Sequence, residues 1–116
     1  MSSETVGAGE AVDLERIGAA RRAGAGLGTR TPIVSSVGLS TTAGGAVTLK
    51  AENLQRTGAF KIRGAMSKLA SLGDGAARGV TAGSAGNHAQ ALALAARHFG
   101  VPCEIFVPSG ASITKI

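Results

Sequence analysis

Lys61 is the side chain of this sequence best suited to covalent chemistry. It lies in the stretch Glu52 to Ala65, ENLQRTGAFKIRGA, after a turn signal at Thr57-Gly58 and at the start of a predicted helix. Side chains at such a junction are presented to ligands, and a desolvated lysine can lose its proton and attack a carbonyl carbon. A solvated surface lysine fits the same local residues and is the more common case.

A second stretch suits ligand binding: GSAGNHAQ, Gly83 to Gln90, between a predicted strand and a predicted helix. Its small residues let backbone N–H groups approach a ligand closely, and the helix dipole favours an anion. Asn87 adds an amide that donates and accepts hydrogen bonds, and His88 adds an acid–base group. Two plainer interpretations stay open, with Asn87 as a helix cap and His88 as a partly buried imidazole with satisfied hydrogen bonds.

Other kinds of catalytic site find no support in the sequence. His88 and His98 are ten residues apart on one predicted helix, a spacing that does not place two metal ligands on one face. The sequence has no GxxxxGK[ST] loop and no GxGxxG turn that opens a helix after a strand. Ser84 has no visible His and Asp partners for a hydrolase triad. A lysine loop beside an anion-binding loop instead favours a Schiff base between Lys61 and an aldehyde cofactor, with no metal.

The elements expected to position these stretches include a strand–helix–strand unit. Residues 79–82 and 101–107 are predicted to be short apolar strands, and the helix between them runs to about residue 99, where Gly100 stops it. One face of this helix carries four apolar residues: Leu92, Ala95, Ala96 and Phe99. Such a unit has parallel strands, and ligands gather at the carboxyl ends of those strands.

The rest of the chain supplies further elements. Val47, Leu49 and Ala51 alternate with polar residues, which predicts a half-buried strand. Residues 1–11 are expected to be disordered because they are polar and contain glycine. The remaining expected elements are a helix from Asp13 to about Arg22, an extended segment at Thr31-Pro32, a loop over 39–45, the half-buried strand over 46–52, and a helix from Lys61 to about Leu72 ended by Gly73 and Gly75.

Composition restricts the class of protein. The 116 residues suffice for one small domain, and the 12 Lys and Arg against 7 Asp and Glu give a net charge of +5. A nucleic-acid-binding module is a weak alternative, because no basic run exceeds Arg21-Arg22 and no aromatic residues alternate with it. The single cysteine, Cys103, lies in an apolar run and is predicted to be buried. Neither a membrane span nor a signal peptide is apparent, so we expect a soluble, cytoplasmic protein without a membrane or nucleic-acid partner.

Both stretches resemble a known family. Leu49 to Ala65, LKAENLQRTGAFKIRGA, closely resembles the cofactor-lysine segment of the threonine dehydratase (threonine ammonia-lyase) family, which belongs to the fold type II pyridoxal-phosphate enzymes. Ser84 to Gln90 resembles the family's second motif at the expected distance. Shorter likenesses occur at Thr31-Pro32-Ile33 and from Val107 to Lys115. The resemblance implies an α/β fold, an open parallel sheet with flanking helices, which is part of the tryptophan synthase β-like architecture.

The resemblance also implies roles for particular residues. Lys61 would bind pyridoxal phosphate as a Schiff base and later remove the substrate's α-proton. Phe60 would pack against the cofactor ring, and Asn87 would hydrogen-bond its hydroxyl. The substrate carboxylate would be held by five consecutive residues: Ser84, Ala85, Gly86, Asn87 and His88. The implied reaction is dehydration and deamination of L-threonine, and possible use of L-serine, to a 2-oxo acid and ammonia.

Departures from the family pattern separate its members. Ile62-Arg63 follows the lysine where cysteine synthase and threonine synthase usually have Asp-Arg, which disfavours both. Serine racemase usually has a serine, its second acid–base group, where this chain has Ala85. Ala59 replaces a more usual serine, a minor change. A serine racemase or serine dehydratase relative and a non-catalytic fragment remain the alternatives.

The family's glycine-rich phosphate loop lies downstream of the residues that match here. We therefore expect residues 1–30 to be a flexible start and leading helix, and residues 31–116 to be the N-terminal part of a truncated catalytic domain. Residues 113–116 would open the next helix. The 116 residues alone are expected to have little or no activity, whereas the full-length enzyme would act on a small amino acid and form a homo-oligomer.

Overall fold

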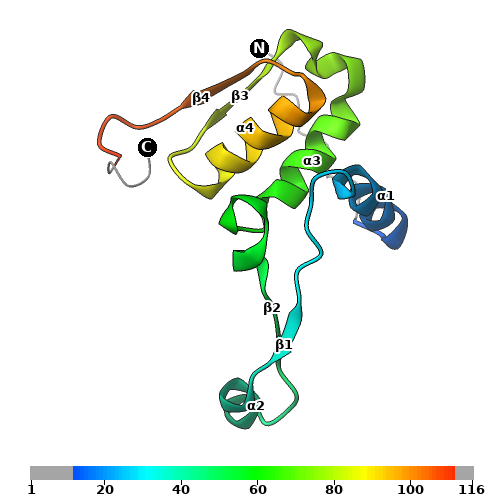
Figure 1. Cartoon of the computed structure of the whole chain (residues 1–116), viewed down its shortest axis with the longest axis vertical. Coiled ribbons are helices and arrows are strands. Elements are labelled where there is room, and N and C mark those ends of the chain that lie inside the picture. Colours follow the sequence, from blue (N-terminus) through cyan, green and yellow to red (C-terminus); the bar gives the residue numbers. More distant parts are fainter. Residues whose placement is uncertain (1–11, 112–116) are drawn as a thin grey trace, which may run out of the picture.

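The computed structural model describes residues 12–111, which form a body of packed helices and a projecting arm (Figure 1). The expectations for residues 1–11 and 113–116 lie outside this range. The helices and strands are, in chain order, α1 Leu14–Gly24, β1 Ile33–Ser35, α2 Val37–Ala43, β2 Thr48–Lys50, α3 Lys61–Leu72, β3 Val80–Gly83, α4 Asn87–Phe99 and β4 Cys103–Phe106. Three short 3-10 turns connect them: η1 Glu52–Leu54, η2 Arg56–Gly58 and η3 Gly73–Arg78.

The strands of the described range form two separate pairs. β3 and β4 are parallel, with Val80 opposite Cys103 and Gly83 opposite Phe106, and α4 connects them. This pair confirms the predicted strand–helix–strand unit and the α/β class. β1 and β2 are antiparallel, with Ile33 opposite Lys50, and belong to the arm rather than to the parallel pair.

The arm consists of β1, α2 and β2, and it extends away from the body (Figure 1). Here the prediction of a loop over 39–45 was wrong, because Val37–Ala43 is helical. The Ser36 hydroxyl caps this helix by accepting the N–H of Leu39, and Gly44 ends it in the left-handed conformation at φ 68°. Threonine side chains, whose low helix propensity suggested a loop, here donate hydrogen bonds to carbonyl groups one turn earlier.

The prediction of a half-buried strand over 46–52 was also wrong in part. β2 covers only Thr48–Lys50, and all its residues are exposed. Leu49 is 44% exposed, because the antiparallel partner β1 is equally uncovered and no other described element covers the arm. Alternation thus marked a strand correctly, but the burial of one face depends on what packs there.

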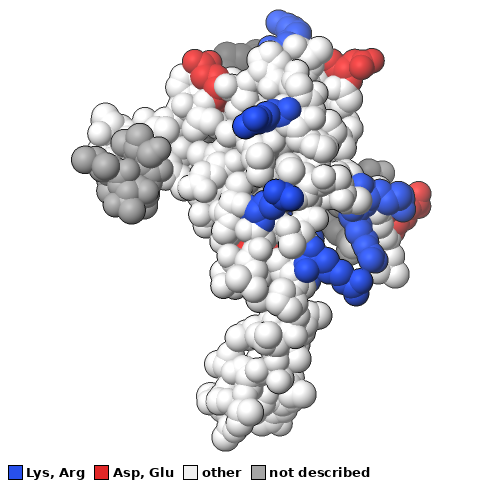
Figure 2. All heavy atoms as spheres, viewed as in Figure 1, with Lys and Arg blue, Asp and Glu red and all other residues white. Residues whose placement is uncertain are grey.

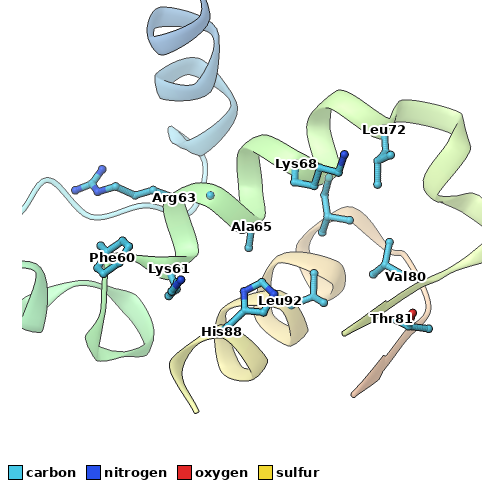
Figure 3. A pocket seen from close by; sticks show the side chains of 12 residues that line it. Phe60, Lys61, Arg63, Ala65, Lys68, Leu72, Val80, Thr81, His88 and Leu92 are labelled. Carbon is cyan, nitrogen blue, oxygen red and sulfur yellow. The ribbon is translucent and has the colours of Figure 1, made fainter. Parts of the chain in front are cut away.

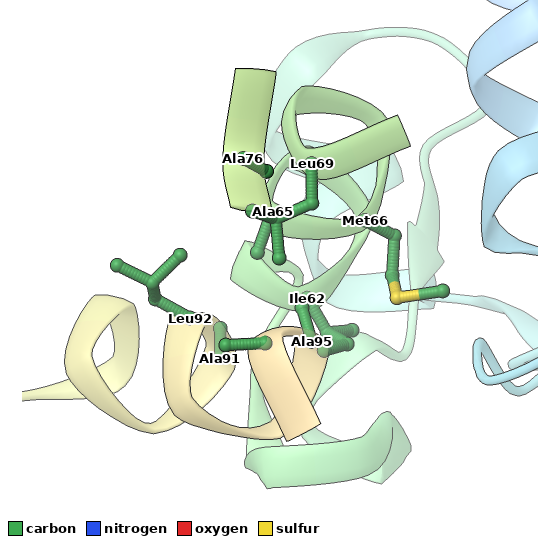
Figure 4. Packing of buried hydrophobic residues seen from close by; sticks show 9 residues of the cluster. Ile62, Ala65, Met66, Leu69, Ala76, Ala91, Leu92 and Ala95 are labelled. Carbon is green, nitrogen blue, oxygen red and sulfur yellow. The ribbon is translucent and has the colours of Figure 1, made fainter. Parts of the chain in front are cut away.

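The core lies between α3 and α4 (Figure 4). Helical spacing places Ile62, Met66 and Leu69 on one side of α3, and all three are buried. α4 meets them mainly with alanines, and these small side chains let the two helix backbones approach closely. The buried residues of α4 are Ala91, Leu92, Ala95 and Ala96.

Two burial predictions near this core need correction. Phe99 ends the predicted apolar face of α4 but is 39% exposed, since it lies at the helix end beside His98 in an edge-to-face contact. Cys103 is exposed rather than buried, because within the described residues β4 pairs with β3 on one edge and has no strand on the other. Both residues lie where the body is incompletely covered.

Helix α1 runs from Leu14 to Gly24 as expected, with the Asp13 side chain accepting the N–H of Arg16 at 2.8 Å. It packs against α3, yet none of its residues is fully buried. Among residues 12–111, none of the helices is long and apolar enough to cross a membrane.

Candidate active site

Lys61 is the first residue of α3, so the predicted loop-to-helix junction is confirmed. Its side chain is exposed, and its Nζ lies 5.3 Å from the centre of the Phe60 ring. A cation within about 6 Å of an aromatic face is attracted by the ring. Phe60 is itself 58% exposed, so an aromatic face and a primary amine are presented together to solvent.

A pocket of about 490 Å³ lies beside Lys61 (Figure 3). α3 forms one wall, α4 contributes His88 and Leu92, and β3 contributes Val80 and Thr81. Lys61 and His88 are 27 residues apart in the sequence, and the fold brings both to this cavity. Its volume is within the roughly 300–1,000 Å³ typical of small-molecule sites.

The second predicted motif forms the start of α4. The Ser84 hydroxyl accepts the N–H of Gly86 at 3.3 Å and that of Ala89 at 3.2 Å. Ser84, two residues before the N-cap Gly86, therefore supplies a capping acceptor for the first turn of this helix. The plainer interpretation of Asn87 as the cap is wrong, because Asn87 is the first helical residue. Of this motif, His88 lines the 490 Å³ pocket, whereas Ser84, Ala85, Gly86 and Asn87 do not.

The start of α4 leaves backbone donors available. Gln90 donates its N–H to the Gly86 carbonyl, and Ala89 donates to Ser84. The N–H groups of Asn87 and His88 precede the first intrahelical hydrogen bond and therefore have no acceptor within the helix. Two donors at the positive end of a helix dipole suit a carboxylate.

A network of polar side chains holds the loop that leads into Lys61. Gln55, 4% exposed, accepts the N–H of Thr29 and donates to the Thr29 carbonyl, both at 2.7 Å. Glu52 accepts hydrogen bonds from Arg63 and from the hydroxyl of Thr31, which is 3% exposed. The Arg63 guanidinium, followed by the weaker contribution of Thr31, holds the pKa of the Glu52 carboxyl at about 2.

Sequence reasoning missed this network. Glu52 is the last residue of the strand predicted over 46–52. Its partner Arg63 lies eleven residues later, a separation that neither helical nor strand periodicity predicts. The turn signal at Thr57-Gly58 was correct, since both residues have positive φ, 63° and 70°. Thr57 adopts this unusual conformation without being glycine, and its buried hydroxyl has no hydrogen-bond partner among the described residues.

These features are typical of one class of protein: α/β enzymes that present a lysine amine beside a helix start with free backbone N–H groups. Residues 25–116 match the family described as "Pyridoxal-phosphate dependent enzyme", and the chain belongs to this family. The residues present fit such a cofactor: Lys61 offers the amine, Phe60 an aromatic face, and the adjoining pocket the space.

Three of the proteins similar to this chain are enzymes with different names. The L-threonine ammonia-lyase of Thermotoga maritima is 49% identical over 106 residues, which cover 90% of this chain and 26% of that protein. The L-threo-3-hydroxyaspartate ammonia-lyase of a Pseudomonas species is 45% identical over 92 residues, covering 78% and 29%. The structure of maize serine racemase is 39% identical with a TM-score of 0.81, covering 91% and 32%.

These comparisons confirm the resemblance and the fold type II architecture. They leave the substrate open, because ammonia-lyases and racemases are similar to this chain to nearly the same degree. The chain spans about a quarter to a third of the length of these relatives.

Proposed function

We propose that this chain carries the lysine-bearing part of a pyridoxal-phosphate-dependent ammonia-lyase that dehydrates and deaminates L-threonine. Residues 31–116 would belong to its catalytic domain, and residues 1–30 would lead into it. The observation that carries the proposal is the shared pocket of Lys61 and His88, at the start of the two helices that hold the family motifs.

Each proposed role follows from the position of a group. Lys61 Nζ would hold the cofactor covalently and then accept the proton from the substrate's α-carbon. Phe60, beside this amine, would cover one face of the cofactor ring. When bound, pyridoxal phosphate supplies the electron sink that makes this proton removable.

The start of α4 would bind the substrate. The free N–H groups of Asn87 and His88 would donate to the carboxylate, with Ser84, Ala85 and Gly86 shaping the loop. The Asn87 amide would donate to the ring hydroxyl of the cofactor. Bound in this way, the amino acid would have its α-carbon toward Lys61, which is what selective proton removal requires.

Serine racemisation is the second candidate, favoured by the similarity to maize serine racemase. Racemisation needs an acid–base group on each face of the α-carbon. Lys61 supplies one, but Ala85 has no titratable side chain at the position where the family's racemases usually have serine. We therefore favour elimination over racemisation.

Cofactor attachment can be tested on the chain itself. We expect that treatment with substoichiometric pyridoxal phosphate, followed by borohydride reduction and peptide mapping, labels Lys61 in preference to Lys50 and Lys68. Lys68 is the matched control, because it is an exposed lysine that lines the same pocket. Equal labelling of the three lysines would contradict the assignment of Lys61.

The reaction can be tested in a chimaera in which residues 31–116 replace the corresponding segment of the Thermotoga enzyme. We expect release of 2-oxobutanoate and ammonia from L-threonine, abolished by Lys61→Ala. We also expect D-serine formation to be slower than elimination and to increase in Ala85→Ser. Faster racemisation than elimination without that substitution would favour the racemase alternative.

A further inference from the structure

We propose that a groove between α1 and α3 binds a small organic phosphate, a phosphate monoester with an apolar body. The groove has a volume of about 630 Å³ and is lined by α1, the segment through Arg30, Lys50 and α3. α1 lies on the side of α3 that faces away from α4 (Figure 1). Lys61 and His88 do not line this groove.

The groove is strongly basic. Four cationic side chains line it, and none of the residues of its lining, all within 12–111, is acidic. Lys and Arg side chains gather beside α1 on the face shown in Figure 2. The four are Arg21, Arg30, Lys50 and Arg63.

Only part of this positive charge is compensated. Arg63 forms an ion pair with Glu52, and Lys50 donates a hydrogen bond to the Thr31 carbonyl. Arg21 and Arg30 have no hydrogen bond or ion pair to another residue of the described range. Two uncompensated guanidinium groups match the two negative charges that a phosphate monoester carries near neutral pH, and their planar donors suit its oxygen atoms.

The wall of the groove explains why the ligand should carry an apolar body. Ile62 and Met66 form part of it and are fully buried, while Ile17 of α1 is 54% exposed. An apolar group placed there would remove the exposed Ile17 surface from water. Among the described residues, none that lines the groove is aromatic, which disfavours single-stranded nucleic acid because base stacking is absent.

Calorimetric titration of the chain with phenyl phosphate tests this site. We expect saturable one-to-one binding that weakens by about tenfold or more in the double variant Arg21→Gln/Arg30→Gln, because two charge-assisted contacts are lost. Arg97→Gln is the matched control, because Arg97 is an exposed arginine that lines neither the groove nor the active-site pocket. This substitution should change the affinity for phenyl phosphate by less than about twofold. Circular dichroism establishes that each variant keeps the wild-type helix content.

Two further ligands separate the contribution of charge from that of the apolar contact. Inorganic phosphate should bind about tenfold more weakly than phenyl phosphate, and phenol should not bind measurably. Lys61→Ala should leave the affinity unchanged, which makes this result independent of the proposed catalytic function. The inference is overturned if phenyl phosphate does not saturate the wild-type chain, if Arg97→Gln weakens binding as much as the double variant, or if inorganic phosphate binds equally well.

Discussion

The guanidinium of Arg63 donates two hydrogen bonds to the carboxylate of Glu52, from Nε to Oε2 and from Nη2 to Oε1, each 2.8 Å long. Glu52 lies at the beginning of the loop that leads into Lys61, and Arg63 follows Lys61 by two residues on α3. The pair therefore ties the beginning of this loop to the first turn of the helix after it. Such a bidentate contact fixes orientation as well as distance.

Glu52→Gln should lower the free energy of unfolding at neutral pH by about 1–2 kcal/mol, allowing for the solvent screening of the half-exposed Arg63. The pKa of Glu52 is depressed to about 2 in the folded chain, from an ordinary value of 4.5. Its contribution is therefore complete above about pH 4.5 and is lost as the pH falls toward 2. Urea denaturation over this pH range measures both effects.

Glu104→Gln is the control for this prediction, because Glu104 is an exposed carboxylate on β4 that forms no ion pair with another residue of the described range. Its loss should leave the acid dependence of stability as it is in the wild-type chain. An equally flattened pH profile in both variants would show that Glu52 has no special part in acid unfolding.

Ala95→Leu should destabilise the body by about 1–3 kcal/mol, because a larger side chain has no room between α3 and α4. Ala95 is fully buried, and it faces Ile62 in the core (Figure 4). Ala93→Leu, an identical change at an exposed position of α4, should have little effect on the urea midpoint. Similar midpoints for the two variants would mean that this helix contact is loose.

Ser84→Ala should lower stability by about 1 kcal/mol, because the Ala89 N–H at the start of α4 loses its acceptor. Amide hydrogen exchange should become faster at Ala89 while the centre of α4 stays protected. Ser109→Ala, at an exposed serine beyond β4, should change neither quantity. Unchanged exchange at Ala89 would rule out Ser84 as the cap.

Gly79→Ala should destabilise the chain by about 1–3 kcal/mol. Gly79 has φ 101°, and a Cβ there would lie 3.2 Å from the Pro102 carbonyl oxygen, where β3 and β4 begin. Gly75→Ala is the matched control, because a Cβ at that position meets no atom within 4 Å. Thermal unfolding should show a lower midpoint for the first variant only, and equal midpoints would contradict the strain at Gly79.

Local pattern was enough to predict most of what positions the candidate site. The helix from Lys61 to Leu72 was predicted with its bounds, because its apolar residues recur every three or four positions and Gly73 can adopt φ 50° at its end. The placement of the second motif at the start of α4 was predicted for the same reason. A loop was predicted where α2 lies, because threonine has a low helix propensity. The sequence does not show that the hydroxyls of Thr41 and Thr42 bond to the helix backbone.

The sequence by itself determined the family, the lysine at a helix start and most of the buried face of α4, because motifs and helical periodicity are local properties of a chain. Only the tertiary structure decided that Lys61 and His88 share a pocket, that Glu52 meets Arg63, and that Cys103 and β2 are exposed. The tertiary structure alone also brought Arg21 and Arg30 to one groove. Each of these depends on which distant elements pack together or leave a face uncovered, and no local spacing specifies that.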